Sequence, residues 1–151
     1  MELSPYGARV GAFFVDLVIL FGLGFAAGVI VGIVFAAGGG SPADNRDALR
    51  VVSFVVGIGI SIGYPAMLLS RKGAHNGQTW GKQATGIRVV RDDGQPMSVG
   101  RALLRQAVGQ QLLALATLYL YLIVDYLWPL GDRENQALHD KVARTNVVRR
   151  S

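Results

Sequence analysis

The sequence predicts an all-α membrane protein, and three apolar stretches carry that prediction. They cover residues 10–37, 51–70 and 107–130, and they contain only two charged side chains, Asp16 and Asp125. Apolar stretches of about 18 residues or more are typical of membrane helices, because about 20 residues span the hydrocarbon core. The chain is 51% hydrophobic and only 17% charged, which excludes a disordered protein, and it has no cysteine, which excludes a disulfide scaffold.

The first two apolar stretches, 10–37 and 51–70, are predicted to be full transmembrane helices within one domain that covers residues 1–151. A cleaved signal sequence is disfavoured for the first stretch, because the apolar region of a signal peptide has about 7–15 residues. The first stretch is nearly twice that length and carries an aspartate, Asp16.

Small residues recur at every fourth position in both of these stretches. The series are Gly24, Gly28 and Gly32 in the first stretch, and Gly59 with Gly63, and Ser53, Gly57 and Ser61, in the second. In lipid, small residues at this spacing let helix backbones approach closely. Glycine is also generally frequent in membrane helices. Series in two neighbouring stretches nevertheless favour direct packing of the first helix on the second.

The distribution of positive charge bears on the path of the third stretch, 107–130. Of the 15 Lys and Arg residues, seven lie in the basic segment 71–106 and five in the basic tail 131–151. Three simple crossings divide the positive charges almost evenly, eight against seven, whereas a tail on the side of the basic segment divides them 13 against two. Because positive residues favour the cytoplasm, we expect the N-terminus, the basic segment and the tail to be cytoplasmic.

That arrangement leaves two paths open for the third stretch. Residues 102–130 are too few for two full spans of about 20 residues each. The stretch is therefore either a third transmembrane helix with the tail outside, or a bent or re-entrant segment that includes an interfacial helix. Breaks of the second kind are tolerated where protein or water covers the backbone.

Two short segments are predicted to be strands, at residues 86–91 and 145–149. The first is followed by a turn signal, Asp92-Asp93-Gly94. A lone strand would leave its edge unpaired, so we expect the two to pair with each other as a small cytoplasmic β element.

Asp16 is the most informative residue of the first stretch. It lies about 9 Å into the predicted span at 1.5 Å per residue, where a charge costs about 2.5–3.5 kcal/mol on insertion scales. Arg9 is two turns away, too far for a direct pair, so we expect Arg105 or Arg101 to be the partner. Two interpretations stay open: a structural ion pair, or a cation or proton site.

Asp125 is expected to be less important. It is surrounded by aromatic residues that resemble a belt at the level of the lipid headgroups, where an aspartate is solvated. The sequence indicates a wet, exposed carboxylate at this position.

One loop motif partly resembles a phosphate-binding loop. The run Gly77-Gln78-Thr79-Trp80-Gly81-Lys82 is one residue too short for a phosphate-binding loop, and Gln83 stands where a magnesium-binding Ser or Thr would be. This route to nucleotide binding is rejected.

No other site chemistry is predicted. Asp140 is placed to orient His139, but His75 and His139 are too far apart in sequence to predict a metal site. The sequence contains no nucleophile–base set that would predict an enzyme. Anionic headgroups explain the basic segment better than nucleic acid does. We therefore expect no metal, no cofactor and no nucleic-acid partner.

Taken in order, these motifs resemble the RDD family of bacterial membrane proteins. The matching residues are Ala8-Arg9, Asp16, the run 77–82, the run 86–90, Asp93-Gly94, Arg101 to Arg105, the run 137–143 and the run 145–148. The resemblance implies that the family's arginine is Arg9, its first aspartate Asp16, and its second Asp140, with Asp125 the weaker choice for the second aspartate. Arg144-Thr145 stands where members often have Gly-Thr.

The resemblance also suggests transport of ions or small solutes. The expected function is therefore a transport component that works as a homo-oligomer and exchanges a monovalent cation or proton. The alternative is a non-catalytic accessory or assembly subunit of a larger membrane complex, in which the charged residues are structural.

Overall fold

The computed structural model describes residues 2–39, 44–107, 120–132 and 134–149. The chain divides into two compact units. We call residues 17–61 the hairpin unit, because they contain most of two long helices. Residues 1–16 and 62–151 form the second unit, which we call the mixed unit.

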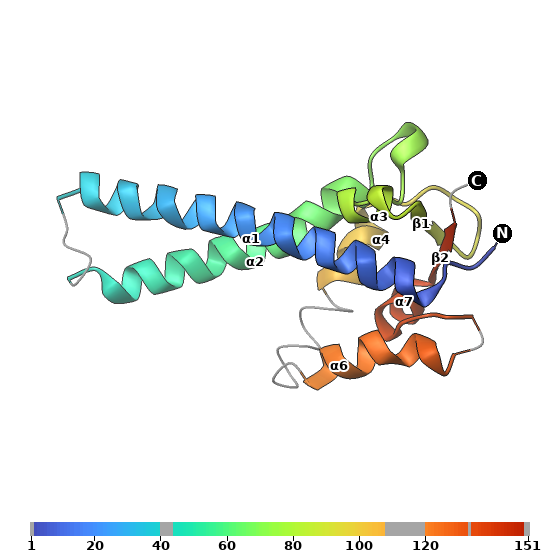
Figure 1. Ribbon diagram of the computed structural model, residues 1–151. Helices are drawn as coiled ribbons and strands as arrows, with labels where there is room; N and C mark the ends of the chain where they lie inside the picture. Colours follow the sequence, from blue (N-terminus) through green and yellow to red (C-terminus); the bar gives the residue numbers. More distant parts are fainter. Residues whose placement is uncertain (1, 40–43, 108–119, 133, 150–151) are drawn as a thin grey trace. The chain divides into compact units, whose positions relative to one another are not determined.

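Two long helices carry the first two apolar stretches, α1 (Tyr6–Ala37) and α2 (Arg46–Leu69). Both are long and apolar enough to cross a membrane, which confirms the prediction of two membrane helices. Figure 1 shows them as an antiparallel pair. Large apolar side chains such as Phe21, Phe25 and Val55 are exposed along them, as expected for surfaces that face lipid.

The third apolar stretch is described only in part, because residues 108–119 lie outside the described residues. The rest forms α6 (Leu120–Leu127) and a 3₁₀ turn, η3 (Trp128–Leu130). The described part of this stretch, eight helical residues or about 12 Å, does not by itself show a crossing of a hydrocarbon core of about 30 Å. Within the described part of the chain, the candidate spans are therefore α1 and α2, and a third span is not shown.

The mixed unit combines short elements with the first turns of α1 and the end of α2. They are the 3₁₀ turn η1 (Gly73–His75), α3 (Trp80–Ala84), β1 (Ile87–Arg91), α4 (Val99–Leu103), α7 (Leu138–Ala143) and β2 (Thr145–Arg149). The two strands pair antiparallel, with Ile87 opposite Arg149, which confirms the predicted β element. Leu3 bridges to Val148, and the Ser4 N–H donates to the Val147 carbonyl at 3.0 Å.

The core of the mixed unit lies between the two-stranded sheet and the helices. Its buried side chains include Leu69 at the end of α2, Ile87 and Val89 of β1, Met97 and Val147. The alternating burial along β1 follows from the pleat, since successive side chains point to opposite faces. This core holds the loops that carry the charged residues described below.

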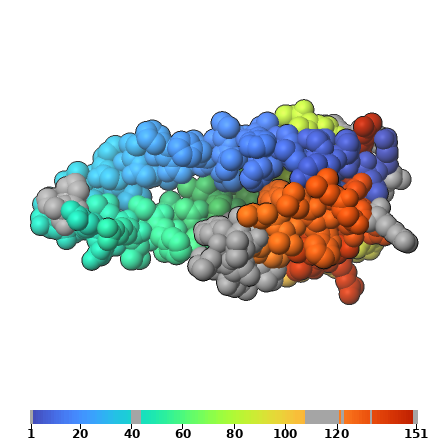
Figure 2. Space-filling view, turned by 60° about the horizontal axis from the view of Figure 1, so that its bottom comes forward, coloured from blue at the N-terminus to red at the C-terminus, as the bar shows by residue number. Residues whose placement is uncertain are grey.

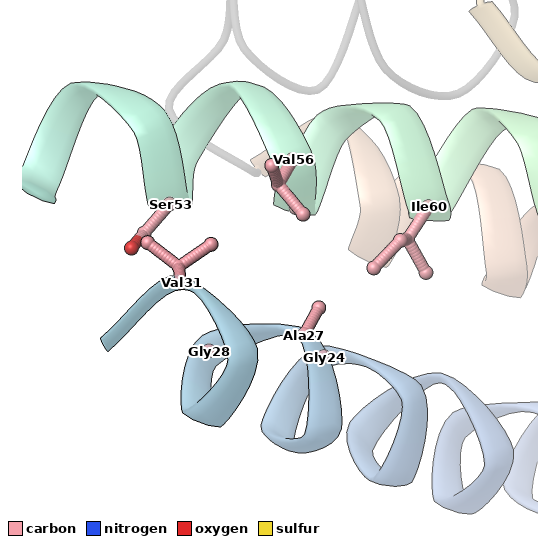
Figure 3. A pocket seen from close by; sticks show the side chains of 8 residues that line it. Gly24, Ala27, Gly28, Val31, Ser53, Val56 and Ile60 are labelled. Carbon is pink, nitrogen blue, oxygen red and sulfur yellow. The ribbon is translucent and has the colours of Figure 1, made fainter. Parts of the chain in front are cut away.

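The close helix packing predicted from the small-residue series is wrong. Within the hairpin unit, Gly24 and Gly28 of α1 and Ser53 and Gly57 of α2 line a common groove of about 50 Å³, and Figure 3 shows most of its lining residues. A Cβ added at any of the predicted packing glycines, including Gly32, would meet no atom within 4 Å. The second predicted series, Gly59 and Gly63, does not line the groove. Larger groove residues such as Val31 and Val56 separate the two backbones.

Candidate functional site: two aspartate clusters

The Asp16 carboxylate of α1 lies in a pocket of hydrogen-bond donors. Its Oδ1 accepts from the Tyr64 hydroxyl of α2 at 2.7 Å and from the Gly81 N–H at 2.9 Å. Its Oδ2 accepts from the Thr79 hydroxyl at 2.5 Å. The Lys82 ammonium is 4.0 Å from Oδ2. The run 77–82 therefore does bind an anion, and that anion is the protein's own carboxylate.

Two glycines allow this loop to approach its neighbours closely, β1 at Gly77 and α1 at Gly81. Gly77 has a φ of +77°, and a Cβ there would lie 2.0 Å from the Val89 carbonyl oxygen. Gly81 packs so closely on α1 that a Cβ would lie 2.1 Å from the Ala12 carbonyl oxygen. Thr79 caps α3, because its hydroxyl accepts from the Lys82 N–H at 3.3 Å. The loop thus needs glycine at both close approaches.

Side-chain hydrogen bonds also connect this loop to the backbone around it. The Gln78 side-chain amide donates to the Ile87 carbonyl at 2.9 Å, and Arg71 donates to the Gln78 carbonyl at 2.9 Å. Gln78 and Thr79 are buried. Irregular backbone at membrane depth is tolerated where protein buries it in this way.

The predicted pairing of Asp16 with Arg105 or Arg101 is wrong. Arg105 binds Asp140 instead, and Arg101 donates to the Ala143 carbonyl at 2.9 Å. The donors from the loop 77–82 already occupy both oxygens of Asp16, and that loop is more than 60 residues away in sequence.

A second cluster surrounds Asp140 of α7. Its Oδ1 accepts from the Arg105 Nε at 3.0 Å and Nη2 at 2.8 Å, and its Oδ2 accepts from Arg9 at 3.4 Å. Arg9 also donates to the Ser4 hydroxyl at 2.8 Å and to the Val147 carbonyl at 3.3 Å. Asp140 is only 1% exposed, so these contacts replace its hydration.

His139 joins this cluster to Asp125 of α6. Its Nε2 lies 2.6 Å from Arg105 Nη2, and its Nδ1 lies 2.5 Å from Asp125 Oδ2. An arginine N–H can only donate, so Nε2 accepts and the ring proton is on Nδ1, where it bonds to Asp125. The His139 backbone N–H also donates to Asp125 Oδ1 at 2.9 Å.

The prediction of a wet Asp125 is therefore wrong, since its exposed fraction is 0%. Two of the aromatic neighbours that suggested a headgroup position, Tyr121 and Tyr126, lie on the same short helix, but the carboxylate contacts His139 of α7. The prediction that Asp140 orients His139 is also corrected, because Asp125 holds the ring nitrogen that carries the proton.

The two clusters are electrostatic neighbours. Burial and the positive charge of Arg105 lower the pKa of Lys82 to about 8, although Asp16 and Asp140 act to raise it. Burial raises the pKa of Asp140, but the guanidinium groups of Arg105 and Arg9 hold it well below its ordinary value. Together the two clusters bring three carboxylates, of Asp16, Asp125 and Asp140, near three cations, Arg9, Arg105 and Lys82, so the formal charges balance.

Comparison with protein families places nearly the whole chain in one of them. The model of the RDD family matches residues 3–144. The chain belongs to the RDD family. Comparisons with curated proteins and with solved structures found no match.

Arg9, Asp16 and Asp140, the residues expected from the resemblance to be the family's arginine and two aspartates, lie in the two clusters of this RDD protein. Arg9 and Asp140 contact each other, and Asp16 lies in the separate loop pocket. His139 and Arg105 join the Asp140 cluster, Lys82 joins the Asp16 pocket, and Arg101 binds the end of α7.

Sequence reasoning missed two residues of the RDD protein's candidate site, Tyr64 and Ser4, and misjudged a third, Asp125, as exposed and less important. Tyr64 had a usable signal, since it is the one phenol within the second apolar stretch. Asp125 had a weaker signal, as a charge in an apolar stretch. Ser4 had none.

The donor types limit the chemistry of these clusters. Within the described residues, no group of three or more His, Cys, Asp or Glu is arranged to hold a metal ion. The Asp16 pocket offers a carboxylate and two hydroxyls, and oxygen atoms are the ligands that hard cations prefer. The Asp16 pocket can therefore bind and release a cation or proton, or it can hold the helices in place.

Proposed function

We propose that this RDD-family protein is a transport component that exchanges protons for a monovalent cation or another small solute, with Asp16 as the central group. The observation that carries the proposal is the enclosed pair of Asp16 and Lys82, 4.0 Å apart. An ionisable residue inside a membrane helix is by default a functional residue that faces an ion or proton path. We expect it to act as a homo-oligomer, because the two candidate spans among the described residues enclose no pathway alone.

Two features support a change of charge at this pair. Lys82 has a pKa of about 8, so it releases its proton far more readily than an ordinary lysine. The hydroxyls of Tyr64 and Thr79 are neutral donors that can also turn an oxygen toward a cation. We expect the protein to move its solute without converting it, and so not to be an enzyme.

The test is ion flux in proteoliposomes across several cations and pH values. Asp16→Asn keeps the size of the side chain and removes its charge, so we expect flux to be lost while the protein stays folded by circular dichroism and gel filtration. Asp47→Asn is the matched control, because Asp47 is an exposed carboxylate at the start of α2, where it pairs with Arg50. Unchanged flux in Asp16→Asn, or no flux in the wild type, contradicts the proposal.

A second function is favoured by the Asp140 cluster. Arg9, Arg105 and Asp140 satisfy one another in a buried network, which is typical of a structural role. This favours an accessory or assembly subunit of a larger membrane complex. Gentle detergent extraction separates the two functions: stoichiometric co-purification with other subunits supports the accessory role, and isolation as a self-oligomer supports the transport role.

A further inference from the structure

We propose that α6 and η3, residues 120–130, form a lipid anchor that lies in the bilayer interface on the same side as the N-terminus and does not cross the membrane. The partner of its exposed apolar face is the bilayer itself, at the boundary between headgroups and acyl chains. The proposal stands independently of the transport function.

One face of α6 is fixed toward protein. Asp125 is fully buried, and its two carboxylate oxygens accept from the backbone N–H and the ring Nδ1 of His139. His139 belongs to α7, which packs on β2 in the mixed unit. This double contact sets the rotation of α6 about its own axis.

The opposite face of α6 is apolar and exposed. The exposed large residues are Ile123, Val124, Leu127, Trp128 and Leu130. In a protein surrounded by water, an apolar patch of this kind marks an interaction site. A helix with one polar face fixed and one apolar face open is typical of a segment in the membrane interface, where tryptophan is also enriched.

A ring contact sets the depth of α6 relative to α1. The rings of Tyr126 and Phe13 lie 4.7 Å apart between centroids. Phe13 is three residues into the first apolar stretch, or about 4.5 Å at 1.5 Å per residue. Figure 2 shows residues 120–130, in orange, against the blue first turns of α1. Interfacial helices bury their apolar face about 5–10 Å into this boundary, so the depth agrees.

The two flanks of the third apolar stretch meet at one side chain. Arg105 precedes the stretch and Asp125 is near its end, yet both contact the ring of His139, at 2.6 and 2.5 Å. A single crossing would separate these flanks by about 30 Å of hydrocarbon. Both flanks therefore lie on one side of the membrane, together with Arg9 and Ser4, which contact the same unit.

The experiment measures the depth of Trp128 by fluorescence quenching. The chain has two tryptophans, so Trp80→Phe leaves Trp128 as the reporter in the full-length protein. The protein is reconstituted into vesicles whose lipids carry bromine either near the headgroups or near the ends of the acyl chains. We expect the shallow bromines to quench Trp128 at least twofold more than the deep ones.

A matched reference defines a deep position. Phe21→Trp, combined with Trp80→Phe and Trp128→Phe, places a single tryptophan at an exposed position well inside α1, and the deep bromines should quench it more. Trp128 quenched mainly by the deep bromines, or by neither kind, overturns the proposal. If Trp80→Phe fails to fold, the quenching lost between the wild type and Trp128→Phe gives the same measurement.

Discussion

Asp140 is held between two arginines that come from distant parts of the chain, Arg9 and Arg105. Replacing it with asparagine leaves both guanidinium groups buried without a counter-charge. Removing one partner of a buried pair costs about 3–5 kcal/mol. We therefore expect Asp140→Asn to lower the free energy of unfolding in detergent by about that amount at pH 7.

The pH dependence provides a check on this prediction. The folded-state pKa of Asp140 is below its ordinary value of 3.8, so its stabilising effect is present above about pH 4 and is lost as the pH falls through the folded-state pKa. The difference between the wild type and Asp140→Asn should shrink in acid. Asp93→Asn, at an exposed carboxylate that pairs with Arg91, should leave stability nearly unchanged. Equal losses in both variants would contradict a special role for Asp140.

Lys82 gives a second pH-dependent prediction, in which folding disfavours the charged form of the side chain. Its pKa falls from 10.5 to about 8 on folding, so the unfolded chain binds more protons than the folded one between these values. Stability should therefore rise with pH from about 8 to 10.5, by at most about 3 kcal/mol. Thermal unfolding of the wild type and of Lys82→Met across this range tests it. The rise should be absent in the variant; parallel curves would show that Lys82 is an ordinary lysine.

Single residues were partly predictable from the sequence. Asp16 stood out, because a charge in an apolar stretch is costly and needs partners. The partners of Asp16 did not stand out. Tyr64, Thr79 and Lys82 are 48 to 66 residues away in sequence, and helical spacing identifies only partners on the same helix, such as Arg9. The same limit explains the error at Asp125, whose partner His139 is on another element.

At the scale of elements, the contact of α3 with α1 requires a residue without a side chain at position 81, which is Gly81. Gly81→Ala would place a Cβ 2.1 Å from the Ala12 carbonyl oxygen and 2.7 Å from the Asp16 carboxyl carbon. The loop must move away, which breaks the Gly81 N–H bond to Asp16. Overpacking of this kind costs about 1–3 kcal/mol, so we expect a clear fall in the thermal midpoint.

Gly28→Ala is the matched control, because nothing lies within 4 Å of an added Cβ there. Alanine also favours the helix by about 1 kcal/mol over glycine. The thermal midpoint of this variant should stay the same or rise slightly. A large loss in Gly28→Ala would mean that the helices pack more closely than the groove between them allows.

Elements with a strong local pattern were predictable. The two membrane helices followed from length and hydropathy, and the strands from β-branched runs and a turn. The groove of the hairpin unit was not predictable, because the spacing of small residues permits close packing of two helices without requiring it. The path of the third apolar stretch stayed open between two alternatives, since a helix as short as α6, which also contains Asp125, carries no topological signal alone.

At the scale of the whole molecule, hydrogen-bonded segments must share one side of the membrane. β1, β2 and the N-terminal residues are joined by backbone hydrogen bonds. The chain lacks cysteine, so single cysteines can report sidedness. We expect Lys72→Cys and Glu134→Cys to react with an impermeant maleimide from the same side, the cytoplasmic one, and Asp47→Cys from the opposite side.

Inverted and right-side-out vesicles distinguish the outcomes. Labelling of Glu134→Cys from the side of Asp47→Cys would mean a third crossing. Labelling of all three from one side would mean that α1 and α2 do not span the bilayer.

The contact between Arg9 and Asp140 has a consequence for biosynthesis. The two residues are 131 positions apart in the chain, and at about 5–20 residues per second a ribosome needs roughly 7–26 s to make that length. During this time the first helix enters the bilayer with its arginine uncompensated. Asp140 and Val147, whose carboxylate and carbonyl Arg9 contacts, are made near the end of translation, so Arg9 reaches its final, partly buried environment only when the chain is almost complete.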